Sequence, residues 1–417
     1  MCGGGSGQRA RGGKGVTGGP LSGVRVIEFG NLVAAPYCGM LLADLGAEVI
    51  KVEPMTGDLA RAIGPFYGDE SAFFLGVNRG KRSVALDPKD QRVKASLVRL
   101  CQQSDVVVSN LRFGAMERMG LGPQALRATA PHLVVAVINA FGSEGPASHR
   151  PGIDLIFQGE SGMMSITGDS GDGPHKTATT IGDFLAGTNA ALAVTSALAG
   201  GGGRDGGKGT HVEISLRDGI IAAQATWNAL YFTGQRQPER TGTASPVTGP
   251  NQTFRTADGY LNLAVVSDRH FVDACGALHL EHIGTDARFA TNELRVRHRD
   301  ELGAILQEVF AGEATSHWLK LLDEVGVPAG RIFDLEEVFT DQQVILNEMV
   351  VDMTHPRIGT FRMQGSPLRL DGVPARSPVS PPVLGQHTIA VLRELGWSDS
   401  EVSELVAAGV ALDGSQF

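Results

Sequence analysis

The chain has 417 residues, of which 42% are hydrophobic and 19% charged, so it is long enough to bury a large core and to form two domains. Its 36 Lys and Arg against 45 Asp and Glu leave a formal net charge of -9. No nucleic acid is expected as a partner, because phosphate neutralisation needs a clustered basic face and the part expected to fold has no dense basic run. A few local arginines still suit a small anionic ligand.

The chain also lacks the marks of a secreted or membrane protein. Residues 1–20 are rich in glycine without the apolar core of a signal peptide, and we expect a disordered tail there. The longest apolar run, 184–201, is shorter than the roughly 20 residues of a membrane span, so no membrane partner is expected. The cysteines have no paired spacing, which is typical of a reducing compartment and predicts a cytoplasmic protein. They are Cys2, Cys38, Cys101 and Cys275.

The N-terminal half alternates short β-branched runs with helical segments. Residues 24–29 form a strand that ends at Gly30, Pro36 suits the first turn of the next helix, and Gly46 suits its end. Residues 48–53 then close a β-α-β unit of parallel type. The alternation predicts an open α/β domain with a Rossmann-like parallel sheet and helices on both faces. Its further strands are expected at 83–86, 105–108 and 133–138, with a helix at 91–104.

The composition becomes polar and rich in turn residues after residue 230. A hairpin at 251–266, with Asp258-Gly259 as its turn, and helices at 268–325 follow this change. Short strands and prolines then alternate over 345–380, and 385–408 has the pattern of a helical pair. We therefore predict a small inserted α+β domain at 240–330, linkers at 229–239 and 331–344, and a large domain made of 21–228 and 345–417.

Three loops lie at the carboxyl ends of the predicted strands, where open α/β sheets bind ligands. Residues 30–36 lead into a helix but lack the G-x-G-x-x-G of a dinucleotide site. Residues 77–82 and 109–118 are basic loops, each of which alone is typical of a solvated surface. Together they favour an anionic ligand. Their candidate cations are Arg79, Lys81, Arg112 and Arg118.

Residues 174–199 end a polar loop at Gly182-Asp183 and continue as an almost uncharged helix. Asp183 has the position of a helix N-cap, where free N–H groups and the helix dipole favour an anion, so we expect it to be ionised at neutral pH. An Asp in this position is ordinarily only a cap. The glycine turn, strand and helix expected at 200–219 indicate that this one is more than a cap.

Three other motifs are weaker. The glycine-rich stretch 202–209 is close to a phosphate-binding P-loop, but Gly209 replaces the Ser or Thr and the stretch follows a helix, which indicates a turn. Cys275, His279 and His282 have no clear fourth metal ligand and are expected to be surface residues, so no metal site is predicted. The absence of G-x-S-x-G argues against a serine hydrolase.

Six collinear blocks between residues 21 and 390 resemble the class III CoA-transferases of CaiB/BaiF type, a family that includes the α-methylacyl-CoA racemases. They are GVRVIEFG with APYCGMLLADLGAEVIKVEP, NRGKRSVALD, SNLRFGAMERMGL, RPGIDLIFQGESGMMSITG, TTIGDFLAGTNAALAVTSAL, and GKGTHVEISLRDG. The resemblance implies that the Asp of the GD block, Asp183, attacks the acyl-CoA. It also implies an interlocked homodimer and no permanently bound cofactor, with CoA and acyl-CoA as substrates.

The resemblance further implies which residues contact CoA and which stabilise the oxyanion. Some members have a basic residue where this chain has Pro54, so Arg61, Arg79 or Lys81 is expected to replace it. Gly182, and Gly249 in the loop 246–250, would supply oxyanion donors. The remaining contacts with CoA implied by the resemblance are Leu32, Val33, Ala34, Asn110, Leu111 and Arg118.

The same comparison favours transfer of CoA to a small carboxylic acid. Racemases have a histidine at the position that corresponds to Ile153. Moving a proton across an α-carbon needs two bases, and Ile153 cannot serve as one. Formyl-transferring members have a glutamine at Val33 and a tyrosine at Ile153, so a formyl or oxalate substrate is not favoured either. Racemisation and non-catalytic CoA binding remain alternatives. For Asp154, the role of a helix cap is preferred over that of an orienting group. Succinyl-CoA is the donor suggested by resemblance alone.

Overall fold

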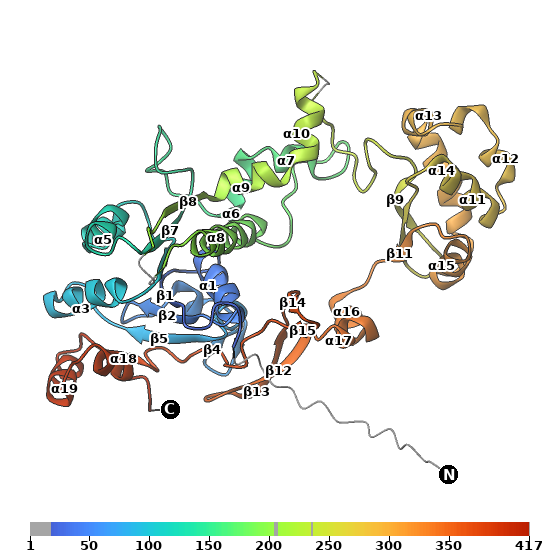
Figure 1. Ribbon diagram of the computed structural model, residues 1–417. Coiled ribbons are helices and arrows are strands. Elements are labelled where there is room, and N and C mark those ends of the chain that lie inside the picture. The colour runs from blue at the N-terminus through green and yellow to red at the C-terminus, as the bar shows by residue number, and fades with distance from the viewer. Residues whose placement is uncertain (1–17, 204–206, 235–236, 417) are drawn as a thin grey trace, which may run out of the picture. The chain divides into compact units, whose positions relative to one another are not determined.

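The computed structural model describes residues 18–203, 207–234 and 237–416 (Figure 1). Most of the predicted tail, 1–17, and residues 204–206 of the P-loop-like stretch lie outside the described residues. The chain divides into two compact units. The first comprises the chain up to Phe157, Thr179–Ala222 and Gln342 onward, and the second comprises Gln158–Ala178 and Ala223–Asp341.

A six-stranded parallel sheet forms the centre of the first unit, with the strand order β5-β2-β1-β6-β7-β8. This is the Rossmann order, in which the chain builds outward from β1 in one direction and then in the other. The predicted α/β fold is therefore confirmed, and the switch point lies between β1 and β6. The strands are β1 Arg25–Phe29, β2 Glu48–Glu53, β5 Lys81–Ala85, β6 Val106–Ser109, β7 Val134–Asn139 and β8 His211–Ser215.

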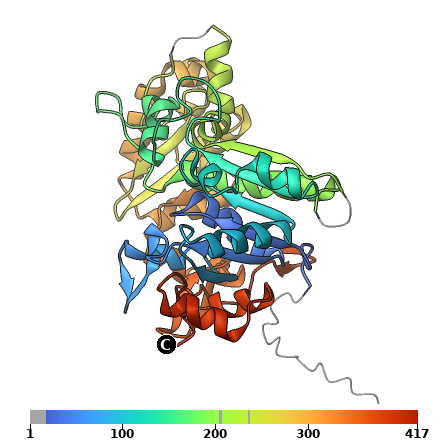
Figure 2. The same cartoon turned by 90° about the vertical axis from the view of Figure 1, so that its left-hand side faces the viewer.

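Alternate residues of each strand face opposite sides of the sheet, and each side is covered by different helices. Ile27 and Phe29 belong to a core that includes side chains of α3 (Gln91–Gln102), α5 (Pro123–Thr129), α18 (Thr388–Glu394) and α19 (Asp399–Ala407). The other side is covered by α1 (Ala34–Asp44) and α8 (Ile181–Ala199), which contact each other and the strands. Figure 2 shows the C-terminal helices, in red, below the N-terminal strands, in blue.

Shorter elements complete the first unit. The chain returns to the sheet at its C-terminus, where Leu86 forms a bridge with Ala411. A hairpin of β12 and β13 packs Val351, Met353 and Phe361 against Leu75. The elements are η1 Leu59–Ala62, β3 Phe66–Tyr67, β4 Glu70–Ser71, α2 Ala72–Leu75, α4 Ala115–Arg118, α6 Asp154–Glu160 (which continues into the second unit), α9 Leu216–Ala223, α17 Gln342–Leu346, β12 Val350–His355, β13 Gly359–Gln364, β14 Arg369–Leu370 and β15 Val373–Pro374.

The second unit is an α+β structure around the predicted hairpin, which is confirmed. Strand β9 pairs antiparallel with β10, and β11 adds a third strand. Cys275 lies in the core of this unit, so its expected surface position is wrong. The elements are α7 Met163–Ile166, α10 Ala225–Phe232, β9 Asn251–Arg255, β10 Tyr260–Ala264, α11 Asp268–Ala277, α12 Glu281–Gly284, η2 Ala287–Phe289, α13 Asn292–Arg297, α14 Arg299–Phe310, α15 Thr315–Glu324, β11 Ala329–Arg331 and α16 Leu335–Thr340.

Helix α8 is unusually apolar for its 19 residues. Among the described residues it is the one helix long and apolar enough to cross a membrane, by length and composition alone; core helices of soluble proteins pass the same criterion.

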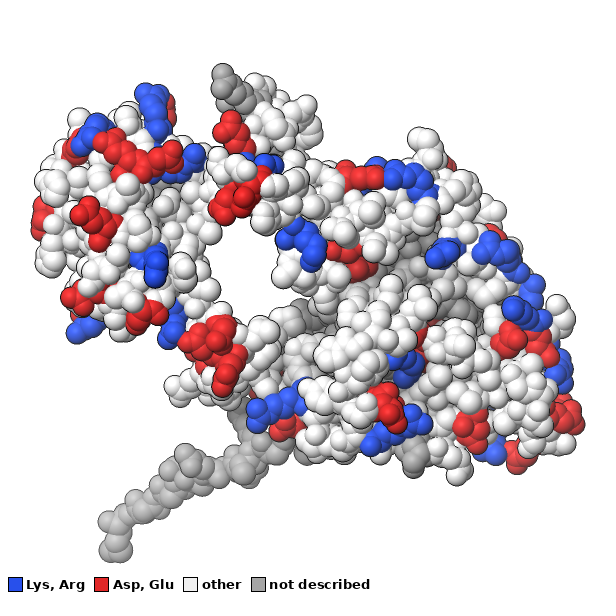
Figure 3. All heavy atoms as spheres, turned by 180° about the vertical axis from the view of Figure 1, so that it is seen from behind, with Lys and Arg blue, Asp and Glu red and all other residues white. Residues whose placement is uncertain are grey.

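The face drawn in Figure 3 shows basic and acidic side chains interspersed, without a continuous basic stripe.

A glycine sets the close approach of α8 to α1. A Cβ on Gly187 would lie 2.6 Å from the carbonyl oxygen of Ala34 and 3.1 Å from the ring of Tyr37. Both distances are shorter than van der Waals contact, and one partner is backbone, which yields little. The two helices can therefore pack at this spacing only while residue 187 has no side chain.

We predict that Gly187→Ala destabilises the first unit by about 1–3 kcal/mol, because the added methyl group pushes α8 away from α1. The gain of about 1 kcal/mol in helix propensity does not offset this strain. Gly219→Ala in α9 is the matched control, since the nearest atom to its Cβ would be 3.7 Å away. Scanning calorimetry of both variants measures the difference. Equal shifts in the two variants would contradict the packing argument.

Candidate active site

Asp183 lies in the first turn of α8, at the edge of the sheet where the parallel strands end. The helix begins at Ile181 and its N-cap is Thr180, whose side chain makes no capping hydrogen bond. The N–H groups of Asp183 and Phe184 both donate to the carbonyl of Thr180, at 3.1 and 3.3 Å. The expectation that Asp183 itself is the N-cap is therefore wrong by three positions, because the helical hydrogen bonding begins earlier than the apolar run.

Asp154 holds the turn that presents Asp183. Its Oδ1 accepts the N–H of Gly182 at 2.8 Å, and its side chain is buried. A Cβ on Gly182 would lie 2.8 Å from Ile220 and 3.0 Å from Asp154 Oδ1. Glycine is thus required for this approach, and Asp154 orients the Gly182-Asp183 backbone. The sequence favoured a helix cap as the role of Asp154, whereas this hydrogen bond favours the orienting role. Asp154 is also the first residue of α6.

Burial, and to a smaller extent the neighbouring carboxylate of Asp154, together raise the pKa of Asp183 to about 7. The positive end of the α8 dipole favours the charged form and so acts in the opposite direction. Asp183 is therefore partly protonated at neutral pH, contrary to the expected full ionisation. Strongly shifted carboxyl groups of this kind are common at functional sites.

Two loops meet at the switch point of the sheet, beside α1. Asn31 N–H donates to Asn110 Oδ1, and Asn110 Nδ2 donates to the Asn31 carbonyl, both at 2.9 Å. The next residue, Leu32, has a left-handed backbone with φ of 62°. The side chains of Val33 and Ala34 are buried, so these two residues offer a ligand only their backbone. The site predicted for residues 30–36 is thus the N-terminus of α1 at the switch point, where anions are favoured.

The first turns of α1 and α8 lie side by side. The rings of Tyr37 and Phe184 meet edge to face, with centroids 4.9 Å apart. Phe184 directly follows Asp183, and Tyr37 is three residues after Ala34. Asp183, the candidate nucleophile, is therefore one residue from the ring contact between α8 and α1, the helix that begins at the switch point.

The three cations that were alternative candidates for binding a CoA phosphate all form ion pairs with carboxylates inside the protein. Arg79 is buried and donates to Asp44 at 2.9 and 2.5 Å, and Lys81 is buried against Glu28 at 2.8 Å. Arg61 makes two hydrogen bonds to Glu53, at 2.7 and 2.9 Å. The assignment of these side chains to a ligand is corrected, since moving them would leave buried carboxylates uncompensated. Residues Arg79 and Lys81 therefore have structural roles here.

The other loop supplies exposed cations. Arg112 precedes α4, Arg118 is the last residue of α4, and both are exposed, while Leu111 is half-buried beside Asn110. Since α4 follows β6, these side chains lie on the carboxyl-end side of the sheet. Arg118 and Leu111 remain predicted contacts for CoA.

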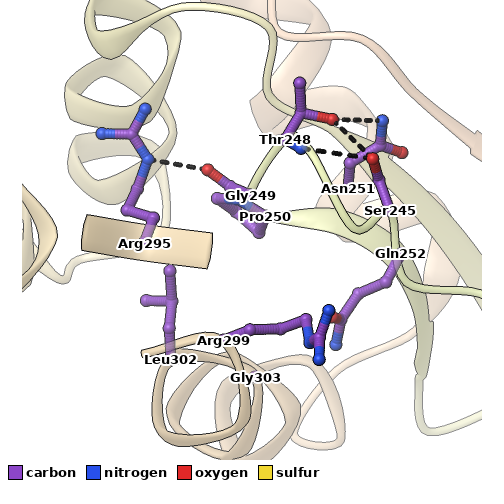
Figure 4. A pocket seen from close by; sticks show the side chains of 10 residues that line it. All are labelled: Ser245, Thr248, Gly249, Pro250, Asn251, Gln252, Arg295, Arg299, Leu302 and Gly303. Atoms are coloured by element: carbon purple, nitrogen blue, oxygen red, sulfur yellow. Dashed lines mark hydrogen bonds between the residues drawn. The ribbon is translucent and has the colours of Figure 1, made fainter. Parts of the chain in front are cut away.

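The two glycines expected to stabilise an oxyanion both have their N–H groups occupied. Gly182 donates to Asp154, and Gly249 donates to Asn292 Oδ1 at 3.1 Å. The carbonyl of Gly249 also accepts from Arg295, beside a small pocket within the second unit (Figure 4). Neither N–H is available to a ligand in this conformation.

The sequence interpretation missed a buried group of charges beneath the loop at the switch point. Glu28, Lys51 and Lys81 stand on the α1 side of their strands, and Asp58 lies close by with its carboxylate 2.8 Å from Lys51. The available signal was a charged residue in the middle of each apolar run, as in RVIEFG and EVIKVE, where a parallel strand buried on both faces is normally apolar.

A family model described as CoA-transferase family III matches residues 21–388. The chain belongs to CoA-transferase family III. It is therefore an enzyme, one that moves CoA between an acyl-CoA and a carboxylate, and the resemblance seen in its sequence blocks is confirmed.

Individual relatives cover almost the whole chain. It is 37% identical to a mouse succinyl-CoA:glutarate CoA-transferase, over 94% of this chain and 90% of the relative. It is 36% identical to succinate--glutarate CoA-transferase of Agrobacterium fabrum, over 90% and 96%. A crystal structure of a CaiB/BaiF family protein from Brucella suis superposes with a TM-score of 0.80, at 33% identity and 90% and 99% coverage.

We predict that Asp183→Asn stabilises this transferase above pH 7. An unfolded aspartate ionises near pH 4, whereas the folded one keeps its proton up to a pKa of about 7. The stability contributed by the protonated form is complete below about pH 4 and is lost as the pH rises through 7. The advantage of the variant should therefore grow between pH 4 and 7 and then level off, at about 1–4 kcal/mol.

Urea unfolding at a series of pH values measures this difference. Asp218→Asn changes an exposed carboxylate in the first turn of α9 and is the matched control. An equal rise in the control variant would show that burial of Asp183 is not the cause.

Proposed function

We propose that Asp183 is the nucleophile of the transfer reaction and that the chain carries CoA from a dicarboxylic acyl-CoA to a free carboxylic acid. One observation supports this above the others: a carboxyl group with a pKa of about 7 is held by Asp154 and Gly182 in the first turn of an apolar helix. It adjoins the helix that starts at the switch point of the sheet.

The proposed chemistry has two halves. The carboxylate of Asp183 attacks the thioester carbonyl of the acyl-CoA, giving a mixed anhydride and CoA thiolate. The thiolate then attacks the aspartyl carbonyl of the anhydride, which releases the donor acid and leaves an aspartyl-CoA thioester. The acceptor carboxylate attacks this thioester to form a second anhydride and thiolate. Attack of the thiolate on the acceptor's acyl carbon yields the new acyl-CoA and frees Asp183.

Only the ionised form of Asp183 can begin this sequence, so its raised pKa has a kinetic consequence. Near pH 7 part of the free enzyme is protonated and inactive, and the fraction ready to attack grows as the pH rises. Each attack places negative charge on a carbonyl oxygen near the first turn of α8. The positive end of this helix favours such charge, whereas the Gly182 N–H is already used by Asp154.

The choice of acids rests on the relatives. Mouse and Agrobacterium relatives are named for succinyl-CoA or succinate together with glutarate. We infer that succinyl-CoA is the donor and that a short dicarboxylate such as glutarate is the acceptor. Ile153, next to Asp154, has no exchangeable proton on its side chain, which favours transfer over racemisation.

The decisive prediction concerns a covalent adduct. Incubation with succinyl-CoA should load CoA onto Asp183, and hydroxylamine should convert the loaded carboxyl group to a hydroxamate that mass spectrometry locates in the peptide. Asp183→Asn should abolish both the adduct and transfer, the latter by more than about 10³-fold, because an amide is not a nucleophile of this kind.

Asp218→Asn should retain the adduct and normal turnover. A hydroxamate at another residue, or transfer that persists in Asp183→Asn, would refute the assignment. Exchange of the α-proton of the acyl-CoA without any adduct would indicate racemisation instead.

A second prediction concerns the substrates. With succinyl-CoA as donor, glutarate should be used with a kcat/KM at least about tenfold higher than butyrate, since a second carboxylate adds a charge-assisted hydrogen bond of about 1.5–3 kcal/mol. Chromatography of the CoA thioesters formed gives these rates. Equal use of both acids would contradict the dicarboxylate inference while leaving the role of Asp183 untouched.

A further inference from the structure

The buried charges under the loop at the switch point form one connected cluster. Lys51 Nζ donates to Glu28 Oε1 at 2.8 Å and lies 2.8 Å from Asp58 Oδ2. Lys81 Nζ lies 2.8 Å from the second oxygen of Glu28. None of these four side chains has any exposed surface. Glu53 extends the cluster, since Oε2 accepts the N–H of Asp58 at 3.0 Å.

Such a cluster is a poor source of stability. Removing ions from water costs several kcal/mol each, and apolar residues of the same volume often stabilise a core equally well. The cluster also requires a special accommodation in α1, because a Cβ on Gly39 would lie only 2.0 Å from Glu28 Oε2. Its position therefore calls for an explanation other than stability, and its contacts outside the charged group provide one.

Two members of the cluster hold the backbone of the loop. Lys51 Nζ donates to the carbonyl of Gly30 at 2.7 Å, and Asp58 Oδ1 accepts the N–H of Leu32 at 2.9 Å. Asp58 Oδ1 also accepts the N–H of Ala60, which fixes the carboxylate at the start of η1. The loop is thus held on both sides of Asn31, the residue that pairs with Asn110.

Leu32 needs this support. Its φ of 62° places a branched, non-glycine residue in the left-handed region, which costs of order 1–3 kcal/mol and persists only where the surroundings enforce it. The hydrogen bond from its own N–H to Asp58 is the most direct restraint on that conformation. Without it, the backbone is expected to relax and to move the start of α1 at Val33 and Ala34.

We propose that Asp58, anchored by Lys51, is a positioning residue for CoA binding: it keeps Leu32 left-handed, so that the loop of residues 30–34 presents its backbone to the ligand. The inference rests on the proposed function in one respect, that this loop contacts CoA. Asp58 acts through the loop and need not touch the substrate, and it has no part in the covalent steps at Asp183.

The test is binding of CoA itself, without an acyl donor, measured by titration calorimetry on the full chain. Asp58→Ala should raise the Kd for CoA about tenfold and speed hydrogen exchange in a peptide covering residues 30–37. Asp58→Asn should stay within about threefold of the native Kd, because its amide oxygen still accepts from Leu32. In turnover, Asp58→Ala should raise the KM for acyl-CoA while kcat changes less than about twofold.

Two further variants keep the test sharp. Asp58→Glu retains a charge for Lys51 but displaces the carboxylate from the Leu32 N–H, so it should weaken CoA binding as Asp58→Ala does, and it carries the test should the alanine variant not fold. Asp90→Asn is the matched control, since the Asp90 carboxylate makes its backbone hydrogen bonds at the start of α3, with the N–H groups of Arg92 and Val93, and not with this loop. It should leave the Kd and the exchange rate unchanged.

The proposal is overturned if folded Asp58→Ala or Asp58→Glu binds CoA with the native Kd, if Asp58→Asn is as damaging as Asp58→Ala, or if exchange at 30–37 stays at the native rate. These outcomes are independent of the nucleophile. Absence of an adduct on Asp183 would refute the covalent mechanism and leave the measured effect of Asp58 on CoA affinity intact.

Discussion

The ion pairs of the Glu28 carboxylate hold together the first strands of the sheet and the loop that precedes α1. The two oxygens of this carboxylate meet the ammonium groups of Lys51 and Lys81, and so tie β1 to β2 and β5 on the side covered by α1. Burial alone would lower the pKa of Lys51, but Glu28 and Asp58 outweigh it and leave that pKa raised. Lys51 therefore stays charged inside the protein, and its remaining donor fixes the loop that precedes α1.

The architecture brings two helix N-termini together at one edge of the sheet. The strand order places the loops after β1 and β6 side by side, and the packing of Gly187 on α1 places the first turn of α8 beside them. Asp183 occupies this edge under opposing influences, since the helix dipole favours the carboxylate while burial and Asp154 favour the acid. A carboxyl group held this way is less ionised than an exposed aspartate but less solvated too, which supports the proposed attack on a thioester.

The prediction of the fold succeeded where local pattern and tertiary environment agree. The apolar runs of β1 and β2, Pro36 in the first turn of α1 and the Asp258-Gly259 hairpin turn were all readable because neighbouring residues decide them. The predicted cations failed for the opposite reason. Arg79 and Lys81 belong to a stretch that looks like a solvated loop in the sequence. Lys81 instead begins β5, and the partners of these two cations, Asp44 and Glu28, are 35 and 53 residues away.

By itself the sequence determined the alternation of strands and helices, the six family blocks and the identity of Asp183 as the candidate nucleophile, since each is contained in a short contiguous stretch. Only the tertiary structure decided how that carboxyl group is charged, because its pKa depends on burial and on Asp154, 29 residues earlier. It also decided which cations face inward and which backbone N–H groups are occupied. Desolvation and hydrogen bonding between distant segments exist only once the chain has folded.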